Sequence, residues 1–121
     1  MPPSSRILIV DASPDNRQVL RTALEKRGIE ILEAARTRQG LALAQTARPD
    51  LVIWNLEDSP PNTAAVTDEV LRQTPASTEL VFLGGVGRPV AHARSAFVPQ
   101  PYHYPRLIST IEHMLSARRA A

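Results

Sequence analysis

Residues 6–15 read RILIVDASPD, and this stretch decides the fold. The run Arg6–Val10 is almost entirely aliphatic and lacks polar alternation, which predicts a strand buried on both faces. Ser13 then stands where a helix N-cap belongs, with Pro14 at the first helical position and Asp15 in the first turn. A buried strand that leads at once into a helix is the first half of a βα unit, the repeating piece of a parallel sheet.

The same alternation of short apolar runs and longer amphipathic runs continues along the chain. The first helix presents Val19, Leu20, Ala23 and Leu24 on one face and ends at Gly28. Further strands are predicted at 29–33, 50–54, 80–83 and 96–98, and further helices at 37–47, 64–73, 89–94 and 105–118. Five βα units with right-handed crossovers predict an α/β fold with a doubly wound parallel sheet. We expect one domain over residues 1–121, with its core at about 6–116.

Composition excludes several classes of protein. The 121 residues include no cysteine, which excludes a disulfide scaffold, a thiol nucleophile and a zinc site with thiolate ligands. No apolar run approaches the ~20 residues that a membrane span needs, and the first residues do not have the shape of a signal peptide. We therefore expect a cytoplasmic protein that does not bind membranes. The net charge of +2, without long blocks of like charge, argues against direct nucleic-acid binding.

Five residues mark the edge of the sheet where a ligand would bind. In doubly wound sheets, ligands sit beyond the carboxyl ends of the strands. Asp11 and Ala12 follow the first predicted strand, and Asn55, Gly84 and Gln100 follow the third, fourth and fifth. These side chains are therefore the candidate site.

At these positions the chain resembles the receiver domain of two-component response regulators. The resemblance is carried by residues 7–17, 48–56 and 97–102. It implies a flavodoxin-like fold with strand order 2-1-3-4-5. It also implies aspartyl phosphorylation, in which an acidic pair and an acceptor aspartate hold a divalent metal. A hydroxyl after the fourth strand and a lysine after the fifth contact the phosphoryl group in that family.

The chain keeps one of those five chemical groups. Asp11 matches the first acid, whereas Ala12 replaces the second and Asn55 replaces the acceptor. Gly84 stands at the hydroxyl position and Gln100 at the lysine position. A neutral amide cannot form an acyl phosphate, and one carboxylate is a poor site for magnesium. We therefore expect a degenerate receiver, or pseudo-receiver, with no catalytic residue, no cofactor and lost or weak magnesium binding.

The resemblance also implies a function through protein partners. We expect a regulatory interaction module that works independently of phosphorylation in a phosphorelay. Its partners would be a histidine kinase, an output domain, another regulator or a second copy of the chain. Two alternatives stay open. Asp58, in the loop after the third strand, could be a displaced phosphoacceptor, or Gly85 and Arg88 could bind a small anion.

Three further features of the chain depend on the resemblance. Phe97 occupies the place of an aromatic residue that reports activation in the family, although a plain core role explains it equally well. Pro101 is a candidate cis proline because Gln100-Pro101 matches a Lys-Pro pair that is commonly cis there. The stretch from Gly84 to Gln100 is short for the family, which predicts a shortened fourth helix.

Overall fold

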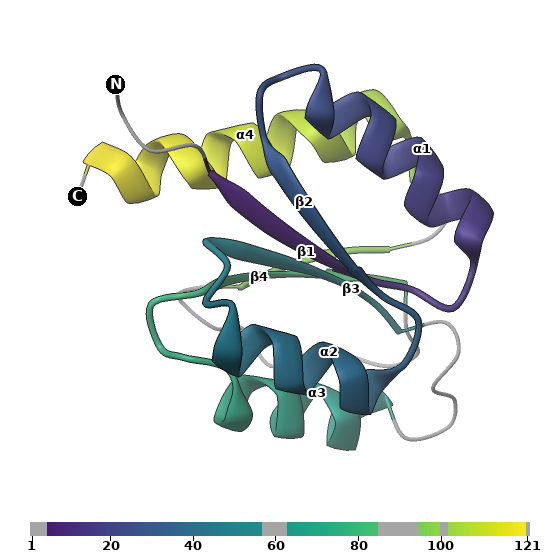
Figure 1. The fold of residues 1–121 in the computed structure, drawn as a ribbon, viewed down its shortest axis with the longest axis vertical. Helices are drawn as coiled ribbons and strands as arrows, with labels where there is room; N and C mark the ends of the chain where they lie inside the picture. Colours follow the sequence, from purple (N-terminus) through teal and green to yellow (C-terminus); the bar gives the residue numbers. More distant parts are fainter. Residues whose placement is uncertain (1–4, 57–62, 85–94, 100–101, 121) are drawn as a thin grey trace.

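Five parallel strands form one sheet in the order β2-β1-β3-β4-β5 (Figure 1). The structure is a computed structural model that describes residues 5–56, 63–84, 95–99 and 102–120. The strand order is the flavodoxin-like order that the resemblance implies, so that prediction is confirmed. The strands are β1 (Arg6–Val10), β2 (Glu30–Ala34), β3 (Leu51–Asn55), β4 (Glu79–Leu83) and β5 (Ser95–Val98).

Four helices are described, two on each face of the sheet. They are α1 (Pro14–Glu25), α2 (Thr37–Thr46), α3 (Thr63–Gln73) and α4 (Tyr104–Ala120). Figure 1 shows α1 and α4 on one face and α2 and α3 on the other. The predicted helix at 89–94 lies outside the described residues, so the shortened fourth helix stays a prediction. Within the described part of the chain, no helix is long and apolar enough to span a bilayer.

The two faces hold separate cores because successive side chains of a strand point in opposite directions. On β1, Ile7 and Ile9 pack toward α1 and α4, whereas Leu8 and Val10 pack toward α2 and α3. The buried helical residues follow the same division, with Leu20, Leu24, Leu107, Ile108, Ile111 and Leu115 on the first face and Ala44 and Val70 on the second. Burial on both faces explains why the three central strands, β1, β3 and β4, read as nearly continuous apolar runs.

Helix α2 approaches the sheet closely at Gly40. A Cβ atom built on Gly40 would lie 2.7 Å from Val10 Cγ2 and 3.1 Å from Trp54 Cη2. Val10 is 3% exposed and Trp54 is 1% exposed, so their two side chains together fill the space that a side chain at position 40 would need. The missing side chain of Gly40 therefore lets the large indole ring pack beneath α2.

Helix α1 differs from its prediction in two details. The capping prediction is confirmed, because the Ser13 side chain accepts a hydrogen bond from the Asn16 backbone N–H at 3.2 Å. The helix ends at Glu25, and Gly28 follows in the turn with φ +78°, a conformation that favours glycine. The prediction that Val19 faces the core is wrong, since Val19 is 45% exposed. Leu20, which is also predicted on this face, lies about 100° further around the helix and is buried.

Candidate functional site

Asp11 and Asn55 meet at the carboxyl edge of the sheet. Val10 and Trp54 are paired across β1 and β3, so the next residue of each strand emerges at the same edge. Asn55 Nδ2 donates a hydrogen bond to Asp11 Oδ2 at 2.9 Å. Asp11 is 3% exposed and Asn55 is 8% exposed. The structure therefore joins two of the predicted site residues in a buried carboxylate–amide pair.

Two more donors surround the Asp11 carboxylate. The backbone N–H of Ser13 donates to Oδ1 at 2.8 Å, and Asn16 Nδ2 donates to Oδ2. The N-terminus of α1 begins three residues after Asp11, and the positive end of a helix dipole favours a negative group there. No ion pair to this carboxylate occurs within the described ranges. Its buried charge is instead stabilised by hydrogen bonds and by the helix.

Asn16 extends this arrangement to the start of α4. This connection is not predicted from the sequence. Asn16 Oδ1 accepts a hydrogen bond from the Tyr104 hydroxyl and a longer one, at 3.4 Å, from the Tyr102 hydroxyl. The two tyrosine rings pack edge to face with centroids 5.7 Å apart. We refer to Asp11, Asn16, Tyr102 and Tyr104 as the Asn16 relay. No sequence pattern indicates it, because its two tyrosines lie 86 and 88 positions from Asn16.

Ala12 and Gly84, two other predicted site residues, contribute little polar chemistry. Ala12 is exposed and offers a methyl group. Gly84 has φ +71° and donates its backbone N–H to Val98 O at 2.9 Å, so it supplies a turn and no hydroxyl. Gln100 lies outside the described residues. The same holds for Pro101 and for the alternative contacts Asp58, Gly85 and Arg88.

Phe97 lies between the second core and an open cavity. Its ring stacks on Phe82 with centroids 4.9 Å apart and an interplanar angle of 16°. It is half-buried, and it lines a cavity of about 250 Å³ between β5 and the start of α4. Tyr102 and Leu107 line the same cavity. The packing on Phe82 agrees with the core role of Phe97, and the structure does not test its switch-like role.

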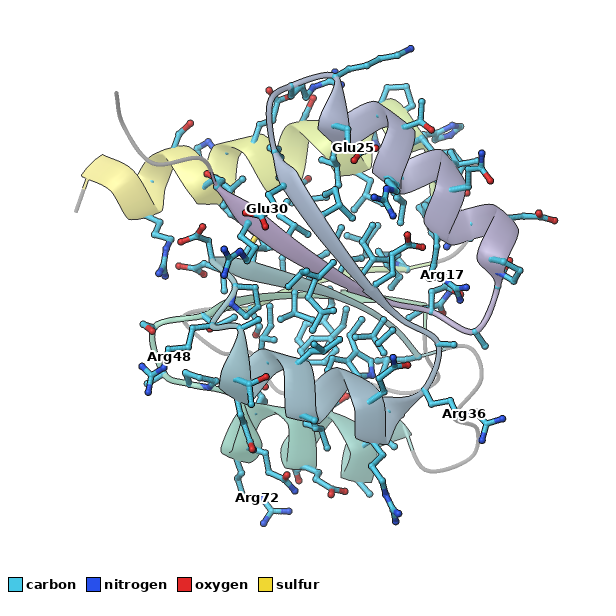
Figure 2. The ribbon with its side chains drawn as sticks, in the orientation of Figure 1. Arg17, Glu25, Glu30, Arg36, Arg48 and Arg72 are labelled. Atoms are coloured by element: carbon cyan, nitrogen blue, oxygen red, sulfur yellow. The ribbon has the colours of Figure 1, made fainter. Side chains whose placement is uncertain are left out.

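Arg17 borders the site from α1 without pairing with the Asp11 carboxylate. Figure 2 shows Arg17 near the start of α1. Its Nη1 donates to the backbone oxygen of Asp11, and its Nε contacts Glu33 Oε1 at 3.0 Å. Glu33 also pairs with Arg21, which has a second partner in Glu25. Glu33 and Glu25 raise the pKa of the Arg21 guanidinium, chiefly through the side-chain hydrogen bond to Glu33. Both arginines therefore join α1 to β2 through Glu33.

The donor set at this edge does not match the divalent metal site that the resemblance implies. Within the described residues, no group of three or more His, Asp or Glu side chains could surround a metal ion. Magnesium prefers carboxylate and water oxygens in near-octahedral geometry. The oxygens of Asp11 already accept three hydrogen bonds, all from amide nitrogens, and an amide nitrogen that carries the donated hydrogen cannot act as a metal ligand.

Comparisons with known proteins agree with this fold. Residues 7–94 match the response regulator receiver domain family. The chain is 29% identical to the polar-differentiation response regulator DivK of Brucella anthropi over 116 residues, which cover 90% of this chain and 94% of DivK. It is 42% identical to protein PilH of Pseudomonas aeruginosa over 52 residues, which cover 43% of each chain.

A solved structure shows the same architecture. Chemotaxis protein CheY4 of Vibrio cholerae matches with a TM-score of 0.74 and 24% identity, covering 93% of this chain and 99% of CheY4. The segment shared with KdpE of Escherichia coli, also 42% identical over 52 residues, covers only 23% of that regulator. The first two curated relatives are thus matched over less than half of their length.

Proposed function

The chain belongs to the family of response regulator receiver domains, and we propose that it works in two-component signalling without accepting a phosphoryl group. The hydrogen bond from Asn55 Nδ2 to Asp11 Oδ2 carries this proposal. The residue at the acceptor position is an amide, and it donates to the one acidic side chain that remains of the family's set. An amide has no carboxylate oxygen that could attack a phosphoryl donor.

The neighbourhood of Asn55 supports the same proposal. Phosphoryl transfer depends on positive charge that neutralises the transferred group. Ala12 and Gly84 add neither a metal ligand nor a hydroxyl, and the Asp11 oxygens are engaged by three donors. We infer that magnesium binds at this edge weakly or not at all. The domain then holds one conformation whether or not a phosphoryl donor is present.

A receiver that does not accept phosphate can still act by binding proteins. We propose a regulatory interaction module, not an enzyme, whose affinity for its partner does not depend on phosphoryl donors. The partner would be a kinase, an output domain, another regulator or a second copy of the chain. A cytoplasmic location stays a prediction.

The test is incubation of the chain with magnesium and acetyl phosphate, followed by intact-mass spectrometry. We expect no mass increase of one phosphoryl group, and a phosphorylatable receiver treated in parallel is the positive control. NMR spectra recorded with and without beryllofluoride, a mimic of the phosphoryl group, should coincide. A stoichiometric adduct on the wild-type chain would contradict the proposal.

Asp58 provides the decisive control if an adduct forms. Loss of the adduct in Asp58→Ala would assign phosphorylation to the displaced acceptor in the loop after β3. Retention of the adduct in Asp58→Ala and its loss in Asp11→Asn would assign it to the buried edge. Either result would replace the proposed function with that of a phosphorylatable receiver.

A further inference from the structure

We propose that Asn16 is a coupling residue, through which a change at the Asp11–Asn55 pair reaches the first turn of α4. Asn16 is the one described residue whose side chain bonds both to Asp11 and to the tyrosines at the start of α4. This coupling does not depend on whether the chain accepts phosphate. The coupling can therefore be refuted while the proposed function stands. The proposed function can likewise be refuted while the coupling stands.

The chemistry of the Asn16 amide gives the relay a direction. A carboxylate only accepts hydrogen bonds, so the NH₂ group of Asn16 must face Asp11. The amide oxygen is then left for the hydroxyls of Tyr102 and Tyr104, which can donate. The orientation of the Asn16 side-chain amide is thus determined by its hydrogen-bond partners at both ends. A shift of the Asp11 carboxylate moves the amide group and with it the acceptor of both hydroxyls.

Asn55 acts on the same oxygen as Asn16. Both side-chain amides donate to Asp11 Oδ2, whereas Ser13 donates to Oδ1. Removal of the Asn55 donor leaves Oδ2 with Asn16 alone and changes the position and strength of that remaining bond. Hydrogen bonds in such a chain polarise one another, so a loss at one end is felt at the other.

The far end of the relay lies where α4 begins. Tyr104 is the first residue of α4, and Tyr102 lines the open cavity between β5 and this helix. Deeper along α4, Ile111 and Leu115 are buried in the core and hold the rest of the helix. The first turn is therefore the part of α4 whose position the relay can alter. The Asn16 relay thus connects the carboxyl edge of the sheet to the wall of the cavity at Tyr102.

The experiment is a double-mutant cycle repeated in two backgrounds. Unfolding equilibrium constants are measured in urea for Asn55→Ala, Tyr104→Phe and their combination. No hydrogen bond joins these two residues in the part of the chain that the structure describes, yet we expect their effects to be non-additive by about two-fold or more in the equilibrium constant. In an Asn16→Ala background, the same cycle should be additive. Asn16 is half-buried, so that background should fold.

Thr110→Val supplies the matched control. Thr110 lies on α4, but its hydroxyl bonds to Arg106 O within the helix. Its substitution should be additive with Asn55→Ala in both backgrounds. Additivity of Asn55→Ala with Tyr104→Phe in the presence of Asn16 would overturn the proposal. Coupling that persists after Asn16→Ala would overturn it too, because the signal would then travel by another route.

Amide chemical shifts give a second readout that does not depend on stability. In ¹H–¹⁵N spectra, Asn55→Ala should shift the amides of residues 104–107 in the wild-type background. The same substitution should leave them unchanged in Asn16→Ala. Shifts confined to the ends of β1 and β3 would contradict the coupling.

Discussion

Replacement of Asn55 by aspartate is the sharpest test of the buried carboxylate–amide pair. The substitution restores the acid that the receiver family carries at this position, with almost no change in side-chain shape. It also converts a 2.9 Å hydrogen bond into a contact between two carboxyl oxygens, in residues that are 3% and 8% exposed. We therefore expect Asn55→Asp to destabilise the chain at neutral pH.

The size of the loss follows from the charges. Two unit charges about 3 Å apart repel by about 5 kcal/mol at an effective dielectric constant of about 20. The folded chain can avoid this repulsion by binding one proton between the carboxylates. That proton costs about 4 kcal/mol at pH 7 and about 1.4 kcal/mol at pH 5, for a carboxyl group of ordinary pKa near 4. We expect a loss of about 3–4 kcal/mol at pH 7 and about 1–2 kcal/mol at pH 5.

The sign of the pH dependence is worked out from proton binding. The folded Asn55→Asp variant binds a proton that the unfolded chain does not hold between about pH 5 and pH 7, so its stability relative to wild type rises as pH falls. Asn55→Ala is the matched control, because it removes the donor and adds no charge. It should cost about 1.5–3 kcal/mol at both pH values. Asn55→Asp should thus be less stable than Asn55→Ala at pH 7. At pH 5 it should be at least as stable as Asn55→Ala.

Urea denaturation at the two pH values measures these differences. Trp54 is the single tryptophan of the chain and precedes Asn55 in β3, so its fluorescence follows the unfolding of this strand. Equal stability of Asn55→Asp and wild type at pH 7 would refute the reasoning. A loss that is the same at both pH values would also refute it, because the two carboxyl groups would then not share a proton.

Three further substitutions test the packing around the site. Gly40→Ala should lower stability by about 1–2 kcal/mol in urea denaturation, because the added methyl would lie 2.7 Å from the buried, stiff side chain of Val10. The cost of this close contact should outweigh the gain in helix propensity, and a more stable variant would contradict this. Phe97→Ala should lower stability by about 2 kcal/mol through loss of the stacked contact with Phe82 and of part of its burial; thermal unfolding unchanged from wild type would argue against that contact in solution. Glu33→Gln should cost about 0.5–1 kcal/mol at low salt and less at high salt, since it removes partly exposed ion pairs to two arginines of α1; a salt-independent loss in the same titration would exclude an ionic origin.

The sequence predicts the sheet well because burial on both faces leaves a local signal. Each of the three central strands, β1, β3 and β4, reads as an apolar run, and the polar residue that ends a run, such as Asp11 or Asn55, marks the carboxyl edge. The meeting of these two residues follows from the parallel order of β1 and β3. The inward direction of Val19 was predicted wrongly because apolar character alone does not distinguish two neighbouring directions on a helix.

The Asn16 relay could not be predicted from local patterns. Asn16 looks like an ordinary polar residue in the first turn of a capped helix, and its partnership with Tyr102 and Tyr104 arises only when α1 and α4 pack on the same face. The shape of that contact depends on the register of α4 against the sheet. Periodicity shows which stripe of α4 is apolar, but it does not show which residue of α1 meets the start of the helix.

The close approach of Gly40 and Trp54 has a consequence for how the chain can evolve. The space that a side chain on α2 would need at this position is also bounded by Val10, since a Cβ atom there would lie 2.7 Å from Val10 Cγ2 and 3.1 Å from Trp54 Cη2. Gly40 therefore cannot change freely while both neighbours stay as they are. A larger residue at position 40 becomes tolerable only after smaller ones appear at positions 10 and 54. Homologous sequences with a larger residue at position 40 should therefore carry smaller residues at these two positions.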